Sequence, residues 1–289
     1  MDYIAKNGSA AGAPKKVAKD TKVEEVVEVA EPIVEAPKSN RVVVDKCNPD
    51  FKIIYDPQAK DVRSHIFCCV IKNCSFNATN LKEFLQMQTK LHETICKKRE
   101  LATIATHDFD LIQGTTLKYT IKPKADIKIK PLGRQDTVTA EKFFNALVAE
   151  AENMRKEKKR SGYTGIHKYL HLLEQQEKFA FLENESGTQV LSLPPMTNSE
   201  TTKLSVNTKR ILVEITSEAT ASICKEVMSQ LLQKSLDLGV CSSDDEDIKL
   251  LSLEQVKIVD KDGSVKTLYP SKVDLIEMES DKVTVERNC

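Results

Sequence analysis

The tripeptide Thr106-His107-Asp108 places a hydroxyl, an imidazole and a carboxylate side by side in the sequence, and such groups can act together in catalysis or ligand binding. It lies between an apolar run and a polar loop, where an imidazole beside a carboxylate can orient a water molecule or hold a ligand hydroxyl. The alternative is structural, because His107 and Asp108 can also tie the loop to the neighbouring backbone. The tripeptide alone leaves both interpretations open.

Other catalytic signatures are missing from the sequence. It contains no motif of the forms GxxxxGK[ST], GxGxxG, GxSxG or HExxH, which disfavours nucleotide-driven chemistry. His167 and His171 stand four residues apart without a third ligand nearby, and the eight cysteines include no CxxC pair. We therefore predict no metal site and no cofactor, and we expect reduced cysteines within a core.

Three groups of basic residues could contact the phosphates of a nucleic acid. They are Lys97, Lys98 and Arg99; Arg155, Lys156, Lys158, Lys159 and Arg160; and Lys203, Lys209 and Arg210. Basic residues at helix ends are also common for reasons of solvation and helix dipole. Because Lys plus Arg and Asp plus Glu number 43 each, affinity for RNA must come from such local groups and not from net charge.

The elements that would position these residues mix strands and helices. Apolar runs predict strands at 65–71, 101–106, 117–121, 127–129 and 210–216. Helical periodicity predicts one helix from a capping box at Asn80 to about Arg99, a second capped by Thr139, and a third around 223–232. Hairpins are expected within 179–193 and across Asp262-Gly263. No βαβ series with a glycine fingerprint appears, so we predict an α+β fold with a largely antiparallel sheet and about three main helices.

The domain organisation follows from composition. Residues 1–45 alternate Ala, Pro, Lys, Val and Glu, and we expect a disordered tail there. One domain is expected over 46–273 with an acidic loop at about 241–248, followed by a C-terminal tail at 274–289. Ser242 and Ser243 precede four carboxylates and are candidates for phosphorylation. No signal-peptide pattern and no run near 18 apolar residues occurs, so we expect a cytoplasmic protein without a membrane partner.

Several separated motifs resemble the phenylalanyl-tRNA synthetase β subunit of eukaryotes and archaea. They read LHETICKKR at 91–99, IATHD at 104–108, KYLH at 168–171, VLSLPP at 190–195, NTK at 207–209 and VEIT at 213–216. Motifs in this order over about 62–235 are more specific than any one alone. The resemblance implies the B3/B4 module of that subunit, a part associated with hydrolysing wrongly tyrosylated tRNA. The C-terminal B3/B4 module of a leucine-rich-repeat protein is more similar still, although no such repeats are visible here.

Through that resemblance, His107, Asp108, Asn198, Thr201 and Thr202 become candidate residues of an editing-type pocket. The loop after Pro194-Pro195 departs from the family pattern, because Ser199 stands where the family has glycine and Thr201 where it has histidine. A side chain in place of hydrogen narrows a pocket, and losing the imidazole removes a polar group. Nothing resembles an ATP-binding catalytic domain. We therefore expect no aminoacylation, and the altered loop argues against an editing hydrolase activity.

Three functions stay open at this point. The leading prediction is a free-standing module that binds tRNA or another structured, translation-associated RNA by its phosphates and its shape. The second is a protein-interaction adaptor for a translation factor or the ribosome. The third is a trans-editing hydrolase that deacylates mischarged tRNA.

Overall fold

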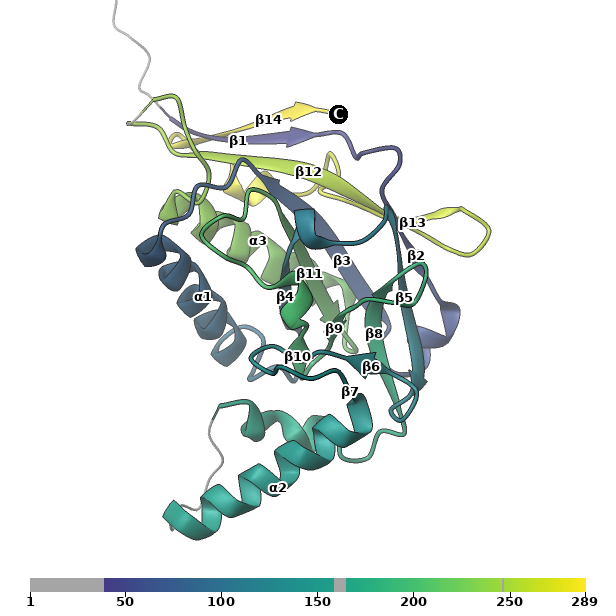
Figure 1. The fold of residues 1–289 in the computed structure, drawn as a ribbon. Coiled ribbons are helices and arrows are strands. Elements are labelled where there is room, and N and C mark those ends of the chain that lie inside the picture. Colours follow the sequence, from purple (N-terminus) through teal and green to yellow (C-terminus); the bar gives the residue numbers. More distant parts are fainter. Residues whose placement is uncertain (1–38, 159–164, 246) are drawn as a thin grey trace, which may run out of the picture. The chain divides into compact units, whose positions relative to one another are not determined.

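Twelve strands form one sheet in the computed structural model, which describes residues 39–158, 165–245 and 247–289 (Figure 1). The chain divides into two units, Met1–Pro37 and Lys38–Cys289, and every described element belongs to the second. Most of the predicted N-terminal tail, together with Lys159, Arg160 and Glu246, lies outside the described residues.

The sheet is built from strands spread along the whole second unit. They are β1 (Asn40–Asp45), β2 (Lys52–Tyr55), β3 (His65–Lys72), β4 (Thr103–Asp108), β5 (Thr116–Pro123), β8 (Lys178–Asn184), β9 (Val190–Leu193), β10 (Thr197–Asn198), β11 (Ile211–Ser217), β12 (Leu250–Val259), β13 (Val265–Tyr269) and β14 (Val283–Asn288). The main path runs β10-β9-β8-β5-β2-β12-β3-β11-β4. Seven of the eleven described pairings in the whole twelve-stranded sheet are antiparallel, which confirms the predicted α+β class and the largely antiparallel sheet.

Three α-helices and five short 3-10 helices accompany the sheet in the described residues. The helices are α1 (Ala78–Glu93), α2 (Ala140–Lys158) and α3 (Ala221–Leu238); the 3-10 segments are η1 (Pro57–Asp61), η2 (Phe109–Leu111), η3 (Gly165–Leu172), η4 (Glu200–Thr202) and η5 (Ile276–Met278). A separate two-stranded sheet pairs β6 (Lys128–Ile129) with β7 (Val138–Thr139). No helix among these is both long and apolar enough to cross a bilayer.

Two strands lie outside the domain boundaries that the sequence predicts. β1 falls within the expected N-terminal tail and β14 within the expected C-terminal tail. β1 runs parallel between β12 and β14, and its Val42 and Val44 are buried. The two ends of the unit therefore pair in one sheet. A short run such as Arg41-Val42-Val43-Val44 becomes a strand only when distant partners pair with it.

The first helix begins and ends at other residues than predicted. Asn77 is its N-cap: its Oδ1 accepts from the backbone N–H groups of Thr79 at 2.8 Å and Asn80 at 3.0 Å, and Asn80 Oδ1 accepts from Asn77 N at 2.7 Å. The capping box predicted at Asn80 thus lies one turn earlier. The helix stops at Glu93, and residues 97–99 all have positive φ, a conformation that a helix cannot continue.

The predicted local features further along the chain are confirmed. Thr139 Oγ1 accepts from Lys142 N at 3.2 Å at the start of α2. β8 pairs with β9 and β12 with β13 as antiparallel hairpins, and Gly263 takes the left-handed φ of 85° that the second turn requires.

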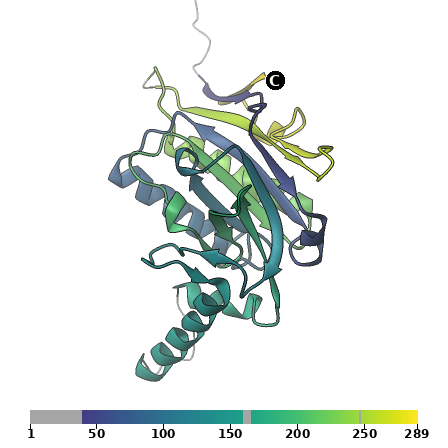
Figure 2. The same cartoon turned by 45° about the vertical axis from the view of Figure 1, so that its right-hand side comes forward.

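One core lies between the helices and the middle of the sheet. α1 packs on α3, and α3 packs on β3 and β11, as the turned view of Figure 2 also shows. Phe84, Leu231 and Ile71 are among its fully buried side chains. A second core lies on the other side of the strands and includes Ile53 and Tyr119. β4, at the end of the sheet path, is therefore buried on both faces, and its alternate side chains meet different surroundings.

Candidate functional site

His107 lies inside a buried polar network. Its side chain is 0% exposed; Nδ1 lies 2.9 Å from Thr202 Oγ1 and Nε2 lies 3.3 Å from Glu214 Oε2. Ser192 Oγ donates to the same Glu214 oxygen at 2.7 Å. The network joins β4, η4, β11 and β9. An imidazole so enclosed cannot activate water in an open cavity, so this geometry fits the structural interpretation of the tripeptide.

Asp108 also holds structure together. Its Oδ1 accepts from the backbone N–H of Asp110 at 3.1 Å and caps η2. Its Oδ2 accepts from Thr208 Oγ1 at 2.7 Å, within the loop that leads to β11. Both carboxylate oxygens are thus occupied by the loops on either side of the strand end.

A cavity of about 610 Å³ lies between α1 and the loop after Pro195. Its walls come from the second half of α1, the start of β4, the loop between β6 and β7, η3 and the segment 196–204. Its volume lies within the range typical of ligand sites. Its polar lining residues are Gln88, Thr89, His92, Glu93, Arg99, Thr106, Lys168, Tyr169, Thr197, Asn198, Ser199 and Lys203.

Gln88 provides a hydrogen-bond donor without a partner at this cavity. The side chain is 7% exposed, and its Oε1 accepts from Thr106 Oγ1 at 3.2 Å. Its Nε2 has no partner among the described residues. A buried donor left unsatisfied costs free energy, so a ligand that offers an acceptor to Gln88 would recover it.

His92 is a neutral donor in the same wall. Its Nε2 accepts from the backbone N–H of Ile104 at 2.8 Å, which leaves the ring proton on Nδ1. Burial, together with the nearby charge of Arg99, lowers the pKa of His92 well below its usual value.

This pKa makes stability depend on pH. Because the pKa of His92 is lower in the folded state than in the unfolded state, unfolding takes up a proton below pH about 6.5, and the contribution of His92 to stability is lost as the pH falls. We expect the loss to approach about 1.4 kcal/mol per pH unit there. Urea unfolding of wild type and His92→Gln between pH 5 and 8 measures it. The difference in slope between the two proteins should vanish above pH 7, and equal slopes below pH 6 would contradict the assignment.

Arg99 holds together two parts of the cavity wall. Its Nη1 donates to the carbonyl oxygens of Pro195 at 2.7 Å and Met196 at 3.2 Å, and its guanidinium lies 4.6 Å from the ring centroid of Tyr169. Tyr169 OH donates in turn to Glu93 Oε1 at 2.8 Å. Burial lowers the pKa of Arg99. These contacts hold the guanidinium in the cavity wall, and its buried Nε has no partner among the described residues.

The remaining predicted pocket residues are divided between the cavity and its surroundings. Asn198 lines the cavity and donates to Thr106 O at 3.4 Å. Thr201 is exposed, accepts from Gln189 Nε2 at 3.3 Å and lies 2.9 Å from Ser199 Oγ. Ser199 lines the cavity, but its hydroxyl also lies 3.1 Å from Lys130 O, so this substituted position is tied into the cavity wall.

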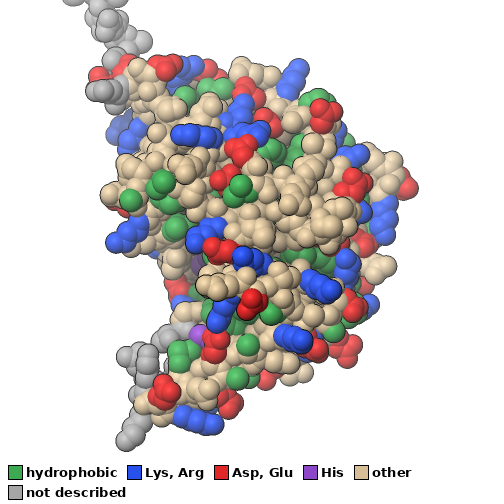
Figure 3. Space-filling model, in the orientation of Figure 1, with side chains coloured by type: hydrophobic (Ala, Val, Ile, Leu, Met, Phe, Trp, Pro, Cys, Tyr) green, Lys and Arg blue, Asp and Glu red, His purple; other side chains and the backbone are tan. Residues whose placement is uncertain are grey.

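The basic groups predicted from sequence are dispersed. Among the described basic residues of those groups, Arg99 and Lys203 line the cavity, and Lys203 pairs with Glu200 at 3.0 Å. Arg210 pairs with Asp110 and lies over the ring of Phe109. The other described members, Lys97, Lys98, Lys209, Arg155 and Lys156, are exposed, and Lys158 lies in the last turn of α2. Figure 3 shows both signs of charge interspersed over the visible face.

The remaining candidates stay as sequence predictions. Ser242 and Ser243 are exposed, as a phosphorylation site requires. His167 lies 3.3 Å from Glu150 Oε2, and His171 is exposed. The described residues contain no group of three or more His, Cys, Asp or Glu side chains that could hold a metal ion.

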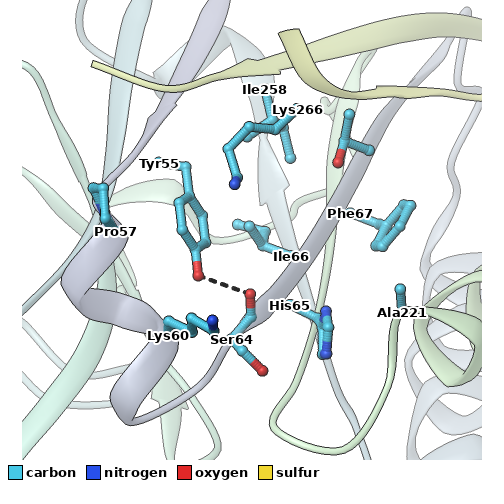
Figure 4. Close-up of a pocket in the computed structure, with 11 residues that line it drawn as sticks. Tyr55, Pro57, Lys60, Ser64, His65, Ile66, Phe67, Ala221, Ile258 and Lys266 are labelled. Carbon is cyan, nitrogen blue, oxygen red and sulfur yellow. Dashed lines mark hydrogen bonds between the residues drawn. The ribbon is translucent and has the colours of Figure 1, made fainter. Parts of the chain in front are cut away.

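A second cavity, of about 400 Å³, lies at the start of β3 (Figure 4). Tyr55 OH donates to Ser64 O at 2.9 Å, and Lys266 Nζ lies 4.8 Å from the centroid of the Tyr55 ring. None of the candidate residues predicted from sequence lines this cavity. The α1 cavity, which holds Asn198, Lys203 and Arg99, is therefore the candidate functional site.

Sequence reasoning missed three residues of this site. His92 and Tyr169 lie within the family-like motifs LHETICKKR and KYLH, but no role followed from the motifs alone. Gln88 gave no signal, because a glutamine in an amphipathic helix is ordinarily exposed. The motifs thus marked part of the cavity wall without indicating which atoms face it.

Comparison with known proteins identifies related chains. No protein-family model matches the sequence. The phenylalanine–tRNA ligase β subunit of Caenorhabditis elegans is 30% identical over 221 residues, 76% of this chain and 33% of that protein. The Saccharomyces cerevisiae subunit is 29% identical over 79% of this chain and 35% of its own length, and the human subunit is 32% identical over 63% and 28%. This chain therefore spans about a third of the length of these relatives.

A solved structure shares the fold. It is an N-terminal fragment of the phenylalanyl-tRNA synthetase β subunit from Pyrococcus horikoshii, with a TM-score of 0.57 and 22% identity. The match covers 82% of this chain and 56% of that one. The resemblance stated from sequence motifs is confirmed, and the comparisons support the B3/B4 region as the shared part.

Proposed function

Because the chain is a relative of the phenylalanyl-tRNA synthetase β subunit over about three quarters of its length, we propose that it is a free-standing RNA-binding module of the B3/B4 type. In this proposal it binds tRNA or a similar structured RNA and carries out no aminoacylation. A cytoplasmic location and a role in translation belong to the same proposal. The relationship to a tRNA synthetase supports the class of ligand, and the α1 cavity supports the place where it binds.

The observation that carries the proposal is the lining of that cavity. The cavity is lined by three cationic side chains, Arg99, Lys168 and Lys203, and by one carboxylate, Glu93. Even with Glu200, which pairs with Lys203, the local charge is positive although the chain as a whole is neutral. Gln88 adds a donor without a partner. A ligand with phosphates at the mouth and hydrogen-bond acceptors inside matches this arrangement, and the end of an RNA strand offers both.

Filter binding of tRNA across a salt series tests the proposal. Phosphate contacts release counterions, so the logarithm of the affinity should fall linearly with the logarithm of the salt concentration. Affinity that does not change with salt, or no binding at low salt, removes the proposal.

Lys203→Ala is expected to weaken tRNA binding and to reduce the salt slope by about one. The reason is that Lys203 lines the cavity with an exposed side chain, and its loss also leaves the Glu200 carboxylate without its ion-pair partner. Lys272→Ala is the matched control, because Lys272 is exposed in the loop after β13 and does not line the cavity. If both variants reduce the slope equally, RNA contacts are not concentrated at the cavity.

The cavity geometry favours binding over hydrolysis. Nε2 of His92 is occupied by a backbone N–H, so the ring offers no free lone pair as a general base. The Glu93 carboxylate is held by Lys168 and by Tyr169 OH, and its pKa is lowered mainly by the hydrogen bond from Lys168. Incubation with tyrosyl-tRNA is therefore expected to give deacylation no faster than buffer.

A further inference from the structure

Cys74 and Cys241 face each other where two segments distant in sequence meet. Cys74 follows β3 by two residues, and Cys241 follows the glycine that ends α3 by two residues. The two form an isolated antiparallel bridge outside the named strands. Both are free thiols, with 2% and 6% of their surface exposed.

The backbone hydrogen bonds around this bridge fix its type. Ser75 N donates to Val240 O at 2.9 Å, and Ser242 N donates to Asn73 O at 2.9 Å. Both bonds belong to flanking residues, so the cysteines occupy a non-hydrogen-bonded antiparallel pair. In such pairs the Cα atoms lie about 4.5 Å apart and the side chains approach closely on one side. A separation of about 4.5 Å falls within the range of about 4.4 to 6.8 Å that a disulfide spans, so a pair of this type can be joined without a large backbone movement.

The two thiols already interact. The proximity of Cys74, together with the Ser252 backbone N–H, lowers the pKa of Cys241. The neighbouring Cys241 thiol and burial raise the pKa of Cys74. Sγ of Cys241 also lies 3.0 Å from Lys72 O. By contrast, burial raises the pKa of each of the four other buried thiols, Cys68, Cys69, Cys96 and Cys224. Because the thiolate is the nucleophile, Cys241 is the better attacking group of the pair.

We propose that Cys74 and Cys241 form a site of reversible oxidation, at which a peroxide converts the facing thiols into a disulfide. The Cys241 thiolate attacks one peroxide oxygen, the O–O bond breaks, and a sulfenic acid and water form after protonation. The Cys74 sulfur then attacks the sulfenic sulfur, the S–O bond breaks, and hydroxide leaves as water with the Cys74 proton. Two thiols lose two electrons, and one peroxide becomes two waters.

The surroundings of Cys241 suit this reaction. Cys241 is the last buried residue before Ser242, Ser243 and Asp244, which are exposed. A small oxidant therefore reaches it through a slight displacement of the following segment. The bond would link the end of β3 to the segment after α3, which are separated by more than half of the chain. A cross-link that closes so long a loop restricts the unfolded state strongly and raises stability.

Peptide mapping of the full chain tests this site. Cys47 and Cys289 are partly exposed, so Cys47→Ser/Cys289→Ser provides a background without those two thiols. The protein is treated with hydrogen peroxide at an equimolar ratio, alkylated, and digested without reductant. We expect a peptide pair joined through Cys74 and Cys241, a loss of two titratable thiols, and a thermal unfolding midpoint raised by several degrees. Dithiothreitol should reverse all three changes.

Adding Cys74→Ser to the same background should abolish the cross-link and the shift in midpoint. The main peptide map is made on the background variant, in which Cys74 and Cys241 are both intact. The proposal is therefore tested even if the variant with Cys74→Ser folds poorly. The proposal is overturned if both cysteines remain alkylated after treatment, or if either is joined to another cysteine instead.

Discussion

Replacing His107 with alanine is expected to lower the free energy of unfolding by about 2 to 4 kcal/mol. The change removes the partner of Thr202 Oγ1 and one partner of Glu214, whose carboxyl is 1% exposed and whose Oε1 already has no partner among the described residues. It also leaves a cavity where four elements meet. Urea unfolding measures the loss as a lower midpoint at an unchanged slope.

Glu214→Gln is the matched comparison for this network. An amide of the same shape keeps an oxygen that can accept from Ser192, and it carries no charge that must be buried. It should therefore cost much less than His107→Ala. If His107→Ala changed the free energy of unfolding by under about 0.5 kcal/mol, as a surface substitution does, the account of a structural histidine would be wrong. A loss of RNA binding in this variant is evidence about the binding site only if its folding is intact.

Replacing Arg99 with lysine is expected to reduce both stability and tRNA affinity. Lysine keeps the charge, but it cannot donate to the two carbonyls of Pro195 and Met196 while it stacks on Tyr169. Hydrogen bonds from a charged group contribute about 1.5 to 3 kcal/mol, so a loss of that order is expected in urea unfolding. The loop that carries Asn198 then lacks its support, and we expect tRNA affinity to fall about tenfold.

Lys98→Ala is the control that distinguishes the loss of a surface charge on this turn from the loss of the Arg99 contacts in the cavity wall. Lys98 is exposed, with a positive φ like its neighbour, and it does not line the cavity. It should change stability little and tRNA affinity less than Arg99→Lys. Should Lys98→Ala weaken binding more than Arg99→Lys at equal stability, phosphate contacts on this turn would matter more than the shape of the cavity.

The sequence predicted those parts of the fold that depend on neighbours along the chain. The hairpin across Asp262-Gly263 and the cap at Thr139 are local, since turn chemistry and a single side chain determine them. Residues 40–45 read as part of a tail in the sequence because their strand partners, β12 and β14, come from the far end of the chain. Pairing between such distant segments leaves no local pattern.

Of the tripeptide that the sequence singles out, only Thr106 lines the α1 cavity. Thr106-His107-Asp108 does lie beside the cavity, yet neighbouring residues of a strand face opposite sides, so Thr106 lines the cavity and His107 points into the buried network. The sequence gives the tripeptide without the register that decides this. Likewise, Lys97, Lys98 and Arg99 read as one basic cluster, but the left-handed turn after α1 directs Arg99 inward.

Cross-linking from the end of the RNA tests the central claim, that the cavity beside α1 is where this module holds RNA. A tRNA with a photoreactive group at its 3′ end is bound at low salt and irradiated, and the attached peptides are identified by mass spectrometry. The account predicts attachment within 85–99, 165–173 and 194–204, the segments around the cavity. Attachment at the cavity beside Tyr55 and Lys266, or binding with no attachment at the α1 cavity, would contradict it.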